Sequence, residues 1–129
     1  MPIELVYLAS TAFLLFGQIL VQALASIRSH SLKFLVGPRD GIEDNNVLSE
    51  RCRRTNANLI EGMIMFTPLV LICAHLNVFS PLTALAAALF FWSRVVFAIT
   101  YWLGVPWVRT LAWFASIIAI FMFAWELFV

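Results

Sequence analysis

The segment RCRRTNANLIEGMIMFTPLVLICAHL, residues Arg51–Leu76, decides how the chain must fold. From about Asn56 to Leu76 it is apolar over roughly the 20 residues that a helix needs to cross the hydrocarbon core of a bilayer. Its first half nevertheless carries three arginines, two asparagines and a glutamate. Polar side chains that continue into a membrane-spanning helix need polar partners, so we expect this helix to form one wall of a polar site.

The composition of the whole chain points to lipid as its solvent. Of its 129 residues, 63% are apolar and 12% are charged, whereas a soluble domain carries about 25% charged residues. A chain with so little charge cannot cover itself with polar surface, which excludes an ordinary soluble globule. The formal net charge is +1 and there is no basic tract, so we do not expect nucleic acid as a partner. The two cysteines and two histidines lack metal-ligand spacing, so we expect no metal site.

Four apolar stretches predict an all-α bundle of four transmembrane helices, which forms one domain over residues 1–129. The stretches cover about residues 3–27, 56–76, 81–103 and 107–129, and a polar loop covers about 28–50. The other two links are short, so successive helices should be antiparallel neighbours. No basic segment precedes the first stretch, which we therefore expect to remain as an anchor rather than to be cleaved.

The basic residues predict the orientation of this multi-pass integral membrane protein. Lysine and arginine are concentrated around the first loop, Arg109 flanks the third loop, and the second loop has no basic residue. The positive-inside rule therefore places the first and third loops, and with them the polar site, in the cytoplasm. Both termini are then expected on the opposite side of the membrane.

Helical geometry gathers the polar residues of the opening segment into a stripe. At about 100° per residue, four side chains fall within an arc of about 80°: Arg51, Arg54, Asn58 and Glu61. Arg53 and Asn56 point elsewhere. Glu61 lies about 15 Å below Arg51 along the helix, within the hydrocarbon, where a charge requires a partner or a polar cavity.

The next two predicted helices supply candidate partners for the stripe. Arg94 lies at a depth similar to that of Glu61, measured from the same face of the membrane, and is its expected partner. Tyr101 is seven residues later and shares a face with Arg94, while Arg109 and Thr110 begin the last helix on the same side. A pocket of cations and hydroxyls, with one carboxylate and one amide, suits an anionic ligand that carries carboxylates.

Each of these features also has a structural explanation. Arg51 and Arg54 could be interfacial anchors, Glu61 and Arg94 could be a pair that only holds the bundle together, and Tyr101 could be an interfacial tyrosine. We interpret Arg53 as an anchor. Two helix-one residues, Gln18 and Gln22, are expected to form hydrogen bonds between helices rather than to bind a ligand.

Two stretches resemble the MAPEG family, the membrane-associated proteins in eicosanoid and glutathione metabolism. ERCRRTNANLIE, residues 50–61, is similar to the family's helix-two signature, roughly Arg-x-x-Arg-x-x-x-Asn-x-x-Glu. SRVVFAITYWLGVPWVRTLAW, residues 93–113, resembles the family's junction between helices three and four. The resemblance implies a homotrimer that binds glutathione at subunit interfaces. It also implies that glutathione is bound by Arg51, Arg54, Asn58, Glu61, Arg94 and Thr110, with Arg109 and Tyr101 as catalytic residues.

The resemblance implies a glutathione-dependent transferase or peroxidase. A free thiol is only a few per cent ionised at pH 7, and the thiolate is the nucleophile. A guanidinium such as that of Arg109 stabilises the thiolate, which would attack a lipophilic electrophile or hydroperoxide dissolved in membrane lipid. Two alternatives remain: a non-catalytic family member that binds lipid or scaffolds a partner, and a small transporter, which the concentration of charge at one face disfavours.

Overall fold

The computed structural model describes residues 1–29 and 47–129, and this part of the chain contains four α-helices and no β-strand. The helices are α1 (Ile3–Ser29), α3 (Val47–Leu76), α4 (Pro81–Leu103) and α5 (Pro106–Phe128). Each is long and apolar enough to cross a membrane. The all-α, four-span, multi-pass architecture predicted from the sequence is therefore confirmed. Most of the predicted loop lies outside the described residues.

The start of α3 differs from the sequence-based expectation. The predicted span begins at about Asn56, whereas the helix begins at Val47 and is 30 residues long. The arginines of the opening segment therefore lie on a continuous helix. The helical periodicity of α3 therefore continues without interruption from Arg51 to Glu61, so the directions of these side chains around the helix can be compared.

The ends of α4 show why the chain turns where it does. Ser80 caps the N-terminus of α4: its hydroxyl accepts hydrogen bonds from the backbone N–H groups of Leu82 and Thr83, and Pro81 occupies the first turn. At the other end Gly104 adopts φ 76°, ψ 26°, a left-handed conformation that ends the helix and that glycine accepts without strain. Pro106 then starts α5.

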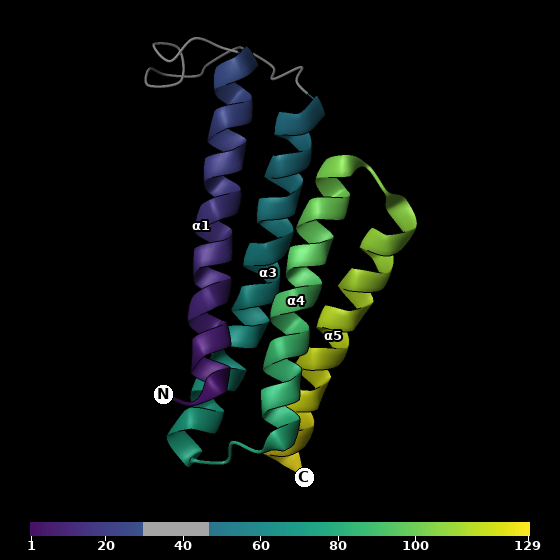
Figure 1. The fold of residues 1–129 in the computed structure, drawn as a ribbon. Helices are drawn as coiled ribbons and strands as arrows, with labels where there is room; N and C mark the ends of the chain where they lie inside the picture. Colours follow the sequence, from purple (N-terminus) through teal and green to yellow (C-terminus); the bar gives the residue numbers. More distant parts are fainter. Residues whose placement is uncertain (30–46) are drawn as a thin grey trace.

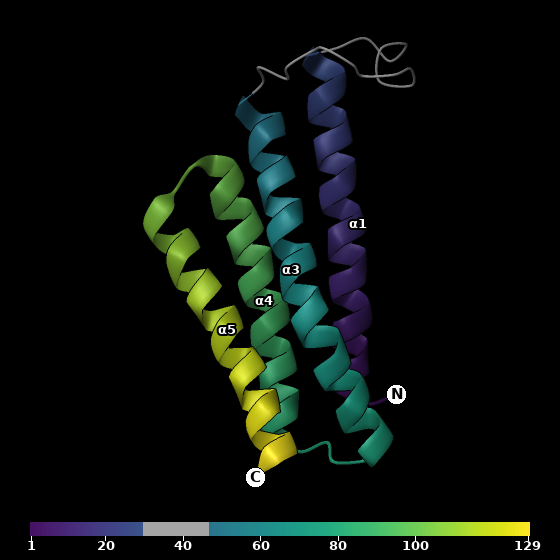
Figure 2. The same cartoon turned by 180° about the vertical axis from the view of Figure 1, so that it is seen from behind.

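The four helices form a bundle in which α1 and α5 lie at opposite edges (Figure 1). Helix α1 packs on α3 and α4, while α5 packs along α4 and also touches α3; in the described residues α1 and α5 do not touch. Both termini lie at one end of the bundle, and the α4–α5 turn lies at the other end with the start of α3. In both views the first turns of α5 lean away from the other helices (Figure 2).

The apolar core lies in the half of the bundle that is nearer to the two chain termini. The rings of Phe66 and Phe90 are stacked with centroids 3.9 Å apart, and Phe123 meets Phe66 edge-on at 5.5 Å. Small residues beside them let the helices approach closely: Ala86, Ala87 and Ala119. The polar side chains of α3 lie in the other half of the bundle.

Helix α1 is held by polar contacts along its buried face. The Thr83 hydroxyl donates to the Glu4 carboxylate at 2.6 Å, and the Asn56 amide donates to the Gln22 side-chain oxygen at 2.6 Å. The expectation that Gln22 bonds helix to helix is thus confirmed. Gln18 is also buried. These hydrogen bonds fix the position of α1 on α3 and α4. Apolar packing alone provides little directional preference in a membrane, because lipid tails are as apolar as the side chains.

Candidate functional site

The polar stripe of α3 faces α4 and α5, as its helical angles predict. Arg51 reaches the backbone oxygen of Trp102, at 3.3 Å, and Arg54 lies beside the phenol of Tyr101. One turn deeper, the side-chain oxygen of Asn58 accepts a hydrogen bond of 2.6 Å from Arg94. Glu61 lines a small cavity together with Arg94. All four predicted residues of α3 therefore converge on the same side of the bundle.

Arg94 is the most unusual residue of this cluster. Only 2% of it is exposed, and it is the largest fully buried side chain of the described residues. Its guanidinium donates to Asn58 and lies 4.3 Å from the centroid of the Phe97 ring. Its Nε–H is buried and has no hydrogen-bond partner in the described part of the chain. The carboxylate of Glu61 lines the same cavity but does not bond to this guanidinium. A buried cation without a directly bonded counter-charge is costly, so this arrangement suits an additional anion.

The expected pairing of Glu61 with Arg94 is met only in part. The two side chains line the same cavity, as their matching depths predict. Within residues 1–29 and 47–129, however, Glu61 forms no ion pair, and Arg94 bonds to the neutral amide of Asn58 instead. Glu61 is exposed on this single chain. The Glu61 carboxylate therefore lies near the guanidinium of Arg94 without a direct ion pair, which the sequence alone did not reveal.

The cavity beside Arg94 has a volume of about 80 Å³. Its polar wall comes from α3 and α4 and its largely apolar wall from α5: Asn58, Glu61, Gly62, Met65 and Arg94 face Trp113, Ser116, Ile117 and Ile120. The Ser116 hydroxyl donates to the backbone oxygen of Trp113 and is thereby occupied. A volume of this size accommodates a few water molecules or one small polar group of a larger ligand.

Arg109 and Tyr101 form the part of the cluster nearest to the α4–α5 turn. The guanidinium carbon of Arg109 lies 4.7 Å from the centroid of the Tyr101 ring, a cation–π contact that joins α5 to α4. Arg109 lies in the first turn of α5 and is half-buried, so its charge adds to a helix terminus that already favours anions. Thr110 is different: it is exposed and its hydroxyl donates to the backbone oxygen of Pro106 at 3.0 Å. The structure does not bring Thr110 into the cluster.

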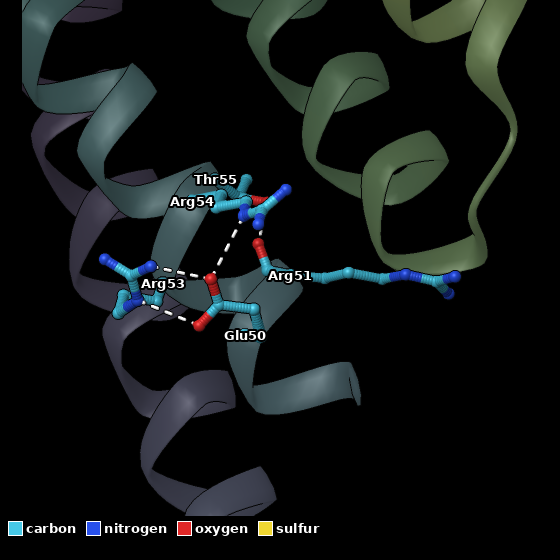
Figure 3. Close-up of polar contacts among 5 residues, drawn as sticks. All are labelled: Glu50, Arg51, Arg53, Arg54 and Thr55. Carbon is cyan, nitrogen blue, oxygen red and sulfur yellow. Dashed lines mark hydrogen bonds and ion pairs between the residues drawn. The ribbon is translucent and has the colours of Figure 1, made fainter. Parts of the chain in front are cut away.

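Glu50 was missed by the sequence-based reasoning. Its carboxylate accepts from Arg53 at 2.6 and 3.0 Å and from Arg54 at 3.0 Å (Figure 3). These partners stand three and four residues away, the spacing at which side chains on a helix meet, so the pairing could have been anticipated had the helix been extended to Val47. Glu50 already occupies part of the Arg54 guanidinium. Arg53, interpreted as an anchor, is exposed.

Together these observations define an integral membrane helix bundle with a cationic polar site at one end, opposite its termini. The particular family follows from comparison with known proteins. The family model "MAPEG family" matches residues 5–129, nearly the whole chain, so the protein belongs to the MAPEG family. No curated protein and no solved structure matches the chain.

Proposed function

We propose that the protein is a membrane-bound, glutathione-dependent transferase or peroxidase that acts on lipophilic substrates. The observation that carries the proposal is Arg94, a buried guanidinium with an unpartnered Nε–H beside a polar cavity. A ligand carboxylate at this point would supply a directly bonded counter-charge and the missing hydrogen-bond acceptor. Membership of the MAPEG family, which is associated with glutathione, makes glutathione the first ligand to test.

The charges of the cluster match those of glutathione. The tripeptide carries two carboxylates, one ammonium group and two amides. Arg54 and Arg94 are the proposed partners of the carboxylates, the exposed carboxylate of Glu61 is the proposed partner of the ammonium, and Asn58 is the proposed partner of an amide. Tyr101 lies between Arg54 and Arg109, so its hydroxyl is in reach of either a carboxylate or the sulfur.

Arg109 is the proposed catalytic cation. Its guanidinium and the N-terminus of α5 both stabilise a negative charge, which favours the thiolate over the thiol. In a transfer reaction the thiolate forms a carbon–sulfur bond and the leaving group departs with its electron pair. In a peroxidase reaction the thiolate attacks the O–O bond, the alkoxide takes up a proton, and the resulting sulfenic acid reacts with a second glutathione to give the disulfide and water.

The exposure of Glu61 supports assembly with neighbouring copies of the chain, which the family resemblance implies is a homotrimer. On the single chain this carboxylate is exposed, although it lies about 15 Å below the start of the polar stripe. A charge facing lipid at that depth is costly, whereas a neighbouring copy and a bound ligand would cover it. We therefore propose that glutathione binds between subunits, with its open side toward the cytoplasm, where the basic loops are expected.

A second candidate function is a non-catalytic lipid-binding or scaffolding member of the family. Two observations favour it: Arg54 is already paired with Glu50, and the hydroxyl of Thr110 is occupied by its own helix. A site whose groups are satisfied internally needs no ligand.

Turnover separates the two candidates. Purified protein in detergent would be assayed for conjugation of glutathione to an aryl halide and for glutathione-dependent reduction of a lipid hydroperoxide. We expect at least one reaction in the wild type and a loss of about a hundredfold or more in Arg109→Ala, a magnitude typical of removing a charge that stabilises a reacting anion. Absence of both reactions in protein that binds glutathione would favour the non-catalytic candidate.

A further inference from the structure

Arg51 contacts the corner between α4 and α5, which is formed by Gly104 and Val105. We infer that Arg51 is a positioning residue for Arg109 rather than a ligand contact. The inference deepens the proposed function, on which it rests for its catalytic consequence. The family resemblance groups Arg51 with the glutathione-binding residues. Its geometry indicates a structural role instead, which the sequence alone does not predict.

The guanidinium of Arg51 caps the C-terminus of α4. Its Nη1 donates to the backbone oxygen of Trp102 at 3.3 Å. At this end the backbone N–H of Gly104 donates to the oxygen of Tyr101, and that of Val105 donates to the oxygen of Thr100. The oxygen of Trp102 belongs to the last turn, where carbonyl groups lack helical partners. A cation at a helix C-terminus is also favoured by the helix dipole.

The guanidinium also lies against the backbone of Gly104. A Cβ atom at this position would be 3.0 Å from Nη2 of Arg51 and 3.1 Å from both Cζ and Nη1. All three atoms are nearly equidistant, so the planar group faces the glycine. Glycine is favoured at this position by its left-handed φ of 76°, and any Cβ here would require the guanidinium of Arg51 to shift by a few tenths of an ångström.

The direction of the Arg51 side chain separates it from its neighbours. Figure 3 shows it extending toward α4 and α5, away from the Glu50 carboxylate that binds Arg53 and Arg54. One donor of the Arg51 guanidinium is thus engaged by the oxygen of Trp102, and its flat face lies against Gly104.

The corner controls the position of Arg109. Only Val105 separates Gly104 from the start of α5, so the orientation of the glycine sets the direction of the new helix. The first turns of α5 lean away from the bundle (Figures 1 and 2), and Val105, Pro106 and Trp107 are exposed. With little packing to hold these turns, the Arg51 contact and the stacking of Arg109 on Tyr101 are what place the catalytic guanidinium.

Hydrogen exchange tests the structural part of the inference without any ligand. In full-length protein in detergent, Arg51→Ala should increase amide exchange of the peptide covering residues 104–112 by about five- to tenfold, the effect of losing one hydrogen bond of ordinary strength. Peptides of α1 should not change. Gly104→Asn keeps a residue that tolerates the left-handed conformation but adds a Cβ, so it should loosen the same peptide, with no further increase when combined with Arg51→Ala.

Glutathione titration tests the catalytic part. Arg51→Ala should leave the dissociation constant within about threefold of the wild type but shift the pH midpoint of the bound thiolate upward, because the guanidinium of Arg109 is no longer held. Arg53→Ala is the matched control for the pH midpoint, since it removes an arginine two residues away that does not touch the corner, and it should leave that midpoint unchanged.

The outcomes are separable. Unchanged exchange of residues 104–112 in Arg51→Ala would overturn the inference, and a dissociation constant raised more than tenfold with unchanged exchange would make Arg51 a ligand contact. If the wild-type protein does not bind glutathione, the proposed function fails, and the exchange experiment still decides whether Arg51 holds the corner.

Discussion

Replacement of Arg94 by methionine should abolish glutathione binding without destabilising the fold. Methionine is unbranched, flexible and apolar, so it replaces the aliphatic part of the arginine side chain beside Asn58 and Phe97 without a charge. A purely structural arginine predicts the opposite result, namely loss of stability with the ligand affinity preserved. The substitution therefore distinguishes a buried cation that binds a ligand from one that stabilises the packing of the helices.

The magnitude follows from the contacts of Arg94. Removing a guanidinium from the hydrocarbon recovers about 3 kcal/mol on insertion scales. Against this stand the hydrogen bond to Asn58, worth about 2 kcal/mol for a charged donor, and the stacking on Phe97, worth about 1 kcal/mol. These terms nearly cancel, so the free energy of unfolding should change by less than about 1 kcal/mol. Loss of one partner of a buried charge pair costs about 3 kcal/mol or more, which corresponds to at least about a hundredfold weaker binding of glutathione.

Two measurements on the same detergent-purified protein decide between these explanations. Thermal unfolding of the unliganded protein reports stability, and equilibrium binding of labelled glutathione reports affinity. Arg94→Lys, which keeps the charge but not the planar group, should retain part of the affinity. The reasoning is refuted if Arg94→Met unfolds at a much lower temperature or binds glutathione as tightly as the wild type.

Three further substitutions test other parts of the account. Glu50→Gln should tighten glutathione binding by about two- to fivefold in a titration at low salt, because Arg54 is released from an exposed ion pair of modest strength; unchanged or weaker binding would exclude competition by Glu50. Thr83→Val removes the hydroxyl that donates to the buried carboxylate of Glu4 and should lower the unfolding free energy by about 2 kcal/mol in a denaturant series, with glutathione affinity unchanged. Gln22→Leu should cost about 1 kcal/mol by leaving the amide of Asn56 without its acceptor, and a stabilised variant would show that this contact does not hold α1.

The architecture was predictable from the sequence because membrane spans leave a strong signal. A bilayer requires about 20 consecutive apolar residues, and the four helices satisfy that requirement independently of how they pack. The direction of the polar stripe was also predictable, since helical periodicity fixes the face on which Asn58 and Glu61 lie. The exact start of α3 at Val47 was not predictable in this way, because its first turns are polar and carry no hydropathy signal.

The individual partners within the site were harder to predict. An arginine side chain is long and flexible, so periodicity gives its face but not its rotamer. Arg51 and Arg54 are three residues apart, yet one caps α4 and the other binds Glu50. Similarly, matching depth placed Arg94 beside Glu61, but the closer acceptor was the amide of Asn58. Thr110 directly follows Arg109 in the sequence, but it is exposed and its hydroxyl donates to the backbone oxygen of Pro106 in its own helix.

The most direct test of the central claim is the ultraviolet absorbance of the glutathione thiolate in wild-type protein and in Arg109→Ala. The account predicts that glutathione binds the wild type in detergent with a thiolate band at neutral pH, and that the band disappears in Arg109→Ala while glutathione still binds. Absence of glutathione binding at millimolar concentration would contradict the account, and the polar site would then be structural or built for a different anion.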